Sequence, residues 1–284
     1  MPSPESAPEV APGPVPWRAA GLYVVLSLGL AWLVALPLWW GGGLAHPAFV
    51  PIAAVVMATP AVAGLVVTFG HLRPRDPWRY LGVTGGSVRG TVGWAVGGAV
   101  AAIALTGGML VLARVLGLVD LRTGPDTAGS LLLVPALTVL IGLTAVGEEI
   151  GWRGFLHTAL RPLGPVRALL LNGAVWGVWH APLLLLGYNY ATTSPVSIPL
   201  MVVSTVLIGT ALAWLRERSG TVWAGALTHG ALNVSASYLM MAFVPPTQQS
   251  PTVSLLGWVG WIVLGAFLAA LVTAGGFRRW TRQR

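Results

Sequence analysis

Two adjacent carboxylates end a long apolar run of this chain. Glu148 and Glu149 follow the apolar residues 131–146, in a chain that has only eight acidic residues. On a helix, Arg153 lies four residues after Glu149, in the order that favours an ion pair. Glu148 is turned by about 100° from Glu149 and has no arginine three or four residues later. We therefore expect Arg153 to neutralise Glu149, and Glu148 to be the less compensated carboxylate and a general base.

Later apolar runs contain two histidines, His180 and His229, and the asparagine Asn233. His229 and Asn233 follow, four residues apart, and this spacing places both side chains on one helix face. At a rise of about 1.5 Å per residue, Glu148 and His180 each lie roughly 18 Å from one end of their expected helices. His229 lies roughly 12 Å from the end of its helix on the same side of the membrane, by the same rise. We expect the three to meet. The remaining histidines fall in loops or at a helix end, and we expect them to be solvated: His46, His71 and His157.

This set of side chains predicts the activation of water for amide hydrolysis. In one arrangement Glu148, helped by His180, takes a proton from water, and His229 and Asn233 donate hydrogen bonds to the oxyanion. In another, Glu148, His180 and His229 are three ligands of a catalytic zinc ion with an open fourth position. The residues leave open whether the cofactor is a zinc ion or none, although no HExxH occurs. Ser/His/Asp catalysis is poorly supported, because Gly-x-Ser-x-Gly is absent.

Each of these residues also has a plainer interpretation. The glutamates can lie at a helix end and face water, and His180 can be a core residue bonded to a backbone carbonyl. Asn233 can be a polar contact between helices. Ionisable groups in a membrane nevertheless mark a functional site by default, because burying them there is costly.

The composition indicates a polytopic, all-α membrane protein. The chain is 55% hydrophobic and 8% charged, with a mean hydropathy of +0.77, whereas soluble domains carry about 25% charged residues. Cysteine is absent, which excludes disulfides, thiol nucleophiles and thiolate metal sites. The net charge of +8 comes from arginines in short gaps between apolar runs. These act as topology signals, so we expect the lipid bilayer, and no nucleic acid, as a partner.

Eight apolar runs are long enough to span a bilayer, at about 20 residues each. They lie near 19–40, 48–69, 90–117, 131–152, 168–187, 197–215, 221–243 and 253–275. With the N-terminus inside, only Arg114 and Arg122 of the sixteen arginines fall outside. The positive-inside rule therefore favours eight spans in a bacterial-type plasma membrane, with both termini cytoplasmic. We expect a disordered tail over 1–17 and one transmembrane domain over 18–284.

The motifs resemble those of the CPBP family of intramembrane proteases, which includes the type II CAAX prenyl endopeptidases and bacterial Abi or bacteriocin-immunity proteins. EExxxR occurs as Glu148, Glu149 and Arg153, and HxxxN as His229 and Asn233. The second motif, usually FxxxH, occurs as WGVWH and ends at His180. Trp176 replaces the phenylalanine, which we expect to change cavity shape more than chemistry. The motifs cover about 131–243.

The resemblance implies an eight-helix fold with a cavity open to the cytoplasm or the bilayer. It also implies that Glu148 and His180 activate water, and that His229 and Asn233 stabilise the oxyanion. The implied substrate is a membrane-embedded or membrane-associated peptide or protein. Two other functions remain open: a proton-coupled transporter in which Glu148, His180 and His229 relay protons, and a non-catalytic immunity or scaffold protein.

Overall fold

The chain folds into helices that extend over nearly the whole of its described length. The computed structural model describes residues 13–124 and 127–278, and no strand occurs in these ranges. The predicted all-α class is confirmed. Most of the predicted tail over 1–17 lies outside the described residues, and α1 begins at Trp17.

Long helices alternate with short helices and helical turns. Their bounds are α1 Trp17–Trp40, α2 Phe49–Val67, α3 Pro77–Tyr80, α4 Val88–Val115, α5 Thr127–Glu149, α6 His157–Leu160, α7 Pro165–Trp179, α8 Ala181–Leu184, α9 Ser197–Ser219, α10 Trp223–Phe243 and α11 Trp258–Thr273. Two π-helices extend α2 and join α5 to α6, at Thr68–Leu72 and Ile150–Leu156, and 3₁₀ turns occupy Gly43–Ala45, Arg161–Leu163, Pro246–Gln248 and Pro251–Val253.

All eight apolar runs are helical, but the predicted count of eight spans is not confirmed. Within the described residues, six helical segments are long and apolar enough to cross a membrane: Trp17–Trp40, Phe49–Leu72, Val88–Val115, Thr127–Leu163, Ser197–Ser219 and Pro251–Thr273. α7 has 15 residues, about 22 Å of helix, and the hydrocarbon core is about 30 Å thick. α10 is long enough with 21 residues, but its polar side chains lower its hydropathy. The chain is a multi-pass membrane protein.

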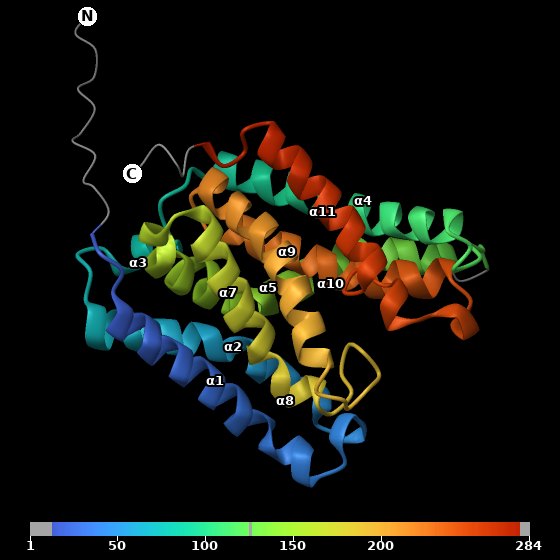
Figure 1. Cartoon of the computed structure of the whole chain (residues 1–284), viewed down its shortest axis with the longest axis horizontal. Helices are drawn as coiled ribbons and strands as arrows, with labels where there is room; N and C mark the ends of the chain where they lie inside the picture. Colours follow the sequence, from blue (N-terminus) through green and yellow to red (C-terminus); the bar gives the residue numbers. More distant parts are fainter. Residues whose placement is uncertain (1–12, 125–126, 279–284) are drawn as a thin grey trace, which may run out of the picture.

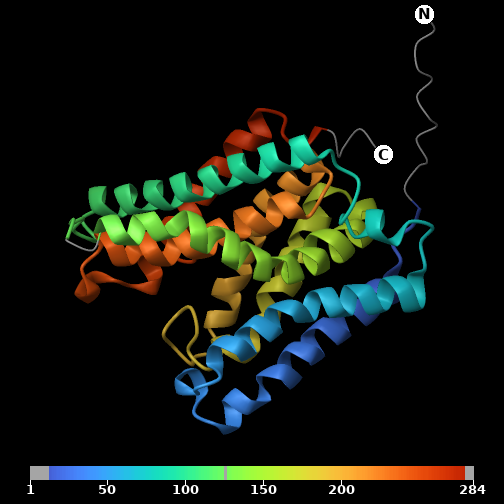
Figure 2. The same ribbon diagram turned by 180° about the vertical axis from the view of Figure 1, so that it is seen from behind.

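α10 lies inside the bundle, which explains how it carries these polar side chains. It packs most extensively against α5 and α4, while α7 packs on α9 and α1 packs on α2. Figure 1 shows α1 and α2 side by side at the lower edge, and Figure 2 shows α4, α5 and α10 together from behind. A polar helix that is enclosed by other helices meets little lipid, so polar side chains are less costly there.

Glycines let α5 and α10 approach closely. A side chain at Gly230 would collide with the backbone of α5 at Gly142 and Thr138. Small residues at helix contacts permit such backbone approach in membranes. The contact places His229, the residue before Gly230, directly against the end of α5.

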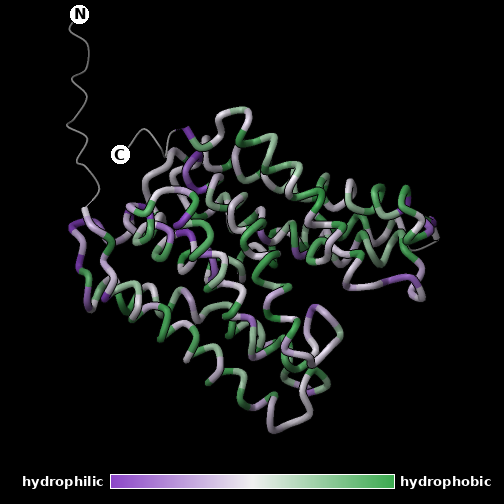
Figure 3. Tube along the Cα trace, in the orientation of Figure 1, coloured by the Kyte–Doolittle hydropathy of each residue, from purple (hydrophilic) through white to green (hydrophobic). Residues whose placement is uncertain are grey.

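The surface and the interior reverse the usual polarity of a soluble protein. Large apolar side chains point outward, as at Trp40 and Leu132, which are both 80% exposed. Glu148, Glu149 and Arg153 are buried. Figure 3 shows hydrophobic colour along the outward-facing helices, with hydrophilic residues mainly in the connecting segments. The ionisable groups are thus shielded from lipid by the helices around them.

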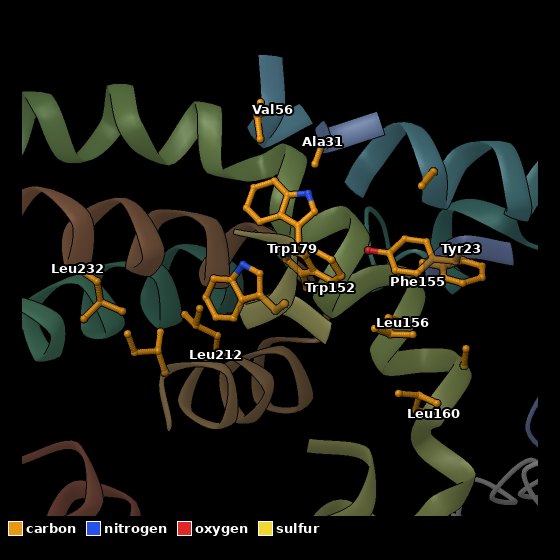
Figure 4. Close-up of a cluster of buried hydrophobic side chains, with 14 of the residues drawn as sticks. Tyr23, Ala31, Val56, Trp152, Phe155, Leu156, Leu160, Trp179, Leu212 and Leu232 are labelled. Atoms are coloured by element: carbon orange, nitrogen blue, oxygen red, sulfur yellow. The ribbon is translucent and has the colours of Figure 1, made fainter. Parts of the chain in front are cut away.

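An aromatic cluster braces the π-helix that follows α5. Tyr23 of α1 stacks on Phe155 with ring centroids 4.7 Å apart, and Trp152 meets Trp179 of α7 edge-on at 5.8 Å. Figure 4 shows these rings converging from separate helices. Such aromatic pairs each contribute about 0.5–1.5 kcal/mol beyond their burial. The cluster therefore fixes the helical segment that carries Arg153.

The links between helices gather at two ends of the molecule. At one end, the Val222 amide donates to the Gly82 carbonyl, and the Thr158 hydroxyl donates to the Tyr80 carbonyl. At the other end, the Arg122 amide donates to the Phe243 carbonyl. Figure 1 shows α3 at one end, far from the link between α4 and α5. The arginine-rich links around α3 therefore share one end of the bundle.

Candidate active site

The predicted ion pair at the end of α5 is confirmed. Arg153 Nη1 donates to Glu149 Oε1 at 2.9 Å, and both side chains are buried, at 1% and 0% exposure. The pair spans the start of the π-helix Ile150–Leu156, and π-helices occur frequently at functional sites. Arg153 carries the positive charge of the site from within the same helical segment as both glutamates.

His229 also binds Glu149, which corrects the expectation that it faces Glu148. Its Nδ1 lies 3.0 Å from Glu149 Oε1, and an ionised carboxylate only accepts hydrogen bonds. The other oxygen, Glu149 Oε2, lies against Gly225 of α10, where a side chain would crowd it. The close contact between α5 and α10 turns His229 toward Glu149, a rotation that spacing along one helix does not specify.

Trp176 connects the other carboxylate to the second histidine. Its indole Nε1 donates to Glu148 Oε2 at 2.7 Å, and its carbonyl oxygen lies 2.8 Å from His180 Nδ1. Because a carbonyl only accepts, His180 Nδ1 carries the proton and Nε2 is the basic nitrogen. The Trp176 ring lies under the Arg153 guanidinium at 4.1 Å and meets His229 edge-on at 5.4 Å.

The contact of Trp176 with Glu148 was not predicted from the sequence. We expected the tryptophan to change cavity shape more than chemistry, yet it donates a hydrogen bond to Glu148. A phenylalanine, usual at this motif position, has no such donor. The signal was present in the residue type, because an indole N–H in apolar surroundings needs an acceptor.

The two glutamates differ in their surroundings. Glu149 is 0% exposed and accepts hydrogen bonds from the Arg153 guanidinium and the His229 imidazole, whereas Glu148 is 3% exposed. Among the described residues, Trp176 is the one side chain that donates a hydrogen bond to Glu148. Glu148 is therefore the carboxylate that remains less compensated and more open to a small molecule such as water.

Asn233 and His180 lie toward the outside of the site. Asn233 follows His229 by one turn of α10 and is exposed, and its side chain makes no hydrogen bond within the described ranges. His180 is partly exposed at the end of α7. Tyr188, in the link after α8, was not singled out from the sequence. Tyr188 is 38% exposed; partial desolvation raises its pKa, and the charge of Glu148 raises it further.

The expectation for His157 was wrong. It is buried at 3% exposure, and its Nε2 lies 2.8 Å from Glu217 Oε1 of α9. Its position near a helix end suggested solvent, but the end of α9 packs over it. His71 is exposed and His46 partly exposed, as expected.

The arrangement of these side chains does not match a three-ligand zinc site. Over residues 13–124 and 127–278, no group of three or more histidine, aspartate or glutamate side chains is placed to hold a metal ion. His180 Nδ1 is directed to a carbonyl and His229 Nδ1 to Glu149. Within the described residues, Glu148, His180 and His229 do not form such a group in this conformation.

Comparison with known families places the segment that carries these motifs. Residues 130–235 match the family described as Type II CAAX prenyl endopeptidase Rce1-like. Over these residues the chain is similar to that family. The match contains α7, most of α5 and α10, and the candidate residues Glu148, Glu149, His180, His229 and Asn233, so it overlaps most of the motif region predicted at 131–243.

A curated relative agrees with this assignment over a shorter stretch. CAAX prenyl protease 2 of Methanococcus maripaludis is 38% identical over 58 residues, which are 20% of this chain and 21% of that protein. The alignment thus spans about a fifth of the relative's length. α1, α2 and α11 lie outside the matched residues 130–235.

Proposed function

We propose that this protein is an intramembrane endopeptidase that hydrolyses peptide bonds of membrane-embedded or membrane-associated substrates. The proposal rests on the surroundings of Glu148, whose carboxylate is buried and accepts a hydrogen bond from the Trp176 indole. The carbonyl oxygen of the same Trp176 lies beside His180 Nδ1. Glu148 lies in the segment that matches a family of endopeptidases. We further propose that the protein resides in a bacterial-type plasma membrane, with the arginine-rich end in the cytoplasm.

Glu148 acts in this proposal as the general base. Water attacks the carbonyl carbon of the scissile peptide bond while the Glu148 carboxylate takes its proton, and His180 Nε2 helps to hold the water. The tetrahedral intermediate then collapses, the C–N bond breaks, and Glu148 returns the proton to the leaving amine. Trp176 is a positioning residue, because its indole fixes one carboxylate oxygen.

His229 and Asn233 stabilise the oxyanion of the intermediate. His229 already uses Nδ1 to bind Glu149, so donation from Nε2 requires a ring that carries both protons. In that cationic form, His229 forms an ion pair with Glu149. Asn233 lies on the same face of α10, four residues later, and its exposed amide is placed to meet a substrate entering from outside.

The proposal is tested by cleavage of a panel of quenched peptides by the purified protein in detergent. His229→Ala is expected to lower kcat/KM by about 10²–10³-fold, as removal of an oxyanion donor does. His71→Ala is the control, because His71 is exposed and lies outside the proposed site. His157→Ala is unsuitable, since it breaks the contact with Glu217. A protein that cleaves nothing, or equal activity of both variants, would refute the proposal.

Metal removal is expected to leave cleavage within about twofold of the untreated rate. The reason is that, among the described residues, no group of three or more histidine, aspartate or glutamate side chains is placed to hold a metal ion. The measurement is peptide cleavage before and after treatment with a zinc chelator, together with metal analysis of the purified protein. Loss of activity that stoichiometric zinc restores would contradict the metal-independent mechanism.

Trp176→Phe is expected to lower kcat/KM by about 10–100-fold. A hydrogen bond to a charged group contributes about 1.5–3 kcal/mol, and each 1.36 kcal/mol corresponds to a factor of ten. The measurement is kcat/KM for peptide cleavage by Trp176→Phe and by the parent protein under the same detergent conditions.

Trp179→Phe is the matched control for this variant. Trp179 lies on the same helix and is equally buried at 3% exposure, but its indole donates to the Thr59 hydroxyl. The same substitution there should leave kcat/KM close to the parent value. If both variants lower kcat/KM alike, the effect is general to the helix and Trp176 has no specific role at Glu148.

A further inference from the structure

A polar pocket lies at the arginine-rich end of the bundle, outside the proposed active site. Its volume is about 390 Å³, and its lining includes Arg79, Arg161, Arg216, His157 and Glu217. These residues come from α3, from α6 and the 3₁₀ turn after it, and from the last turns of α9. None of them belongs to the motifs EExxxR, WGVWH and HxxxN.

The positive charge of this pocket exceeds what its own carboxylate balances. Glu217 Oε1 contacts His157 Nε2 at 2.8 Å, and Glu217 Oε2 accepts from Arg161 Nη2 at 3.1 Å. Both oxygens of Glu217 are therefore engaged. Within the described residues, no carboxylate lies at ion-pair distance from Arg79 or Arg216. An anion entering the pocket would meet two guanidinium groups that no carboxylate of the described residues pairs.

Arg216 is held in the pocket wall and is not extended into solvent. Its guanidinium lies against Gly82, where a side chain would collide with it, and Gly82 has φ +68°. Arg216 Nε is buried, and none of the described residues supplies an acceptor for it. Across the pocket, Arg79 is exposed, and Asp76 bonds to its backbone amide. Arginines that only signal topology need no such packing, so the arrangement indicates a binding role.

The depth of the pocket in the membrane suggests what its ligand is. Four of the candidate spans end or begin beside it: Phe49–Leu72, Val88–Val115, Thr127–Leu163 and Ser197–Ser219. The lining residues lie in the last turns of these spans or in the links just beyond them, which is the level of the lipid headgroups. Basic pockets between membrane helices at this level bind anionic headgroups.

We propose that this pocket binds the phosphate group of an anionic phospholipid, with Arg79 and Arg216 as its main contacts. Guanidinium groups bind phosphate oxygens through paired N–H donors. A soluble phosphate compound would present the same chemistry, and the test below separates the two sources. The proposal is independent of peptide cleavage, because it concerns binding at the end of the bundle.

The test is the melting temperature of the purified protein in a neutral detergent. Added phosphatidylglycerol is expected to raise it by at least about 3 °C, whereas equal amounts of phosphatidylcholine leave it unchanged. An equal rise with millimolar inorganic phosphate alone would support phosphate binding and identify a soluble source. Equal effects of the two lipids, with no effect of phosphate, would overturn the proposal.

Variants then locate the binding. Arg79→Gln combined with Arg216→Gln is expected to remove at least half of the rise with phosphatidylglycerol. The control is Arg114→Gln combined with Arg122→Gln, the same charge change at the other end of the bundle. Arg79→Gln alone, at an exposed residue, tests the site if the double variant does not fold. A full rise in Arg79→Gln and in the double variant would show that the lipid binds elsewhere.

Discussion

Glu148→Gln is expected to lower kcat/KM for peptide cleavage by about 10²–10⁴-fold, the usual contribution of a general base. Glutamine has nearly the same shape, and its amide oxygen still accepts the Trp176 hydrogen bond that Glu148 Oε2 accepts at 2.7 Å. The fold should therefore persist, with a melting temperature within about 2 °C of the parent protein, since a neutral substitution at this site breaks no ion pair. The variant would lack only the group that removes a proton from water.

The measurements are single-turnover cleavage of a quenched peptide and the melting temperature of the same preparation. Glu217→Gln is the control, because it neutralises a different membrane-end carboxylate outside the proposed site. It should keep cleavage while losing stability through His157 and Arg161. If Glu149→Gln abolishes cleavage and Glu148→Gln leaves it intact, the roles of the adjacent carboxylates are the reverse of those proposed.

Glu149→Gln is expected to cost about 3–5 kcal/mol in the free energy of unfolding, the range for breaking one partner of a buried ion pair. The substitution leaves Arg153 charged and 1% exposed beside a neutral amide. It also weakens the contact that orients His229. For a protein of this size the loss corresponds to a melting temperature lower by about 10 °C.

A second substitution distinguishes the ion pair from a general effect of altering α5. Adding Arg153→Met to Glu149→Gln removes the uncompensated charge and should recover at least half of the lost stability. The measurement is the melting temperature of both variants under the same detergent conditions. If Glu149→Gln alone melts with the parent protein, the Glu149–Arg153 contact does not stabilise the fold.

Contacts within one helix could be predicted because the backbone fixes them. The spacing of Glu149 and Arg153 places them one turn apart, and they form the expected pair at 2.9 Å. The same argument holds for His229 and Asn233 on α10. On α10 this geometry follows from hydrogen bonds between residues four apart, and the Glu149–Arg153 pair forms even though the π-helix Ile150–Leu156 begins between the two residues. Neither spacing argument requires knowledge of the neighbouring helices.

Contacts between helices could not be predicted in the same way. His229 meets Glu149, and not Glu148, because α10 approaches α5 at Gly230 and Gly142 with a particular rotation. The contact of His157 with Glu217 joins residues 60 positions apart. The sequence places such residues at similar depths, but a rotation of one helix by 100° exchanges adjacent side chains.

The sequence by itself determined the membrane class, the helical architecture and the polar residues that distinguish this chain, because apolar length and local spacing carry that information. Only the tertiary structure decided that α7 ends at Trp179, short of a full span, and that Trp176 binds Glu148. It also decided how Glu148 and Glu149 divide their partners. These features depend on the packing of side chains from different helices, which sets each helix's rotation and has no counterpart in the local pattern of one segment.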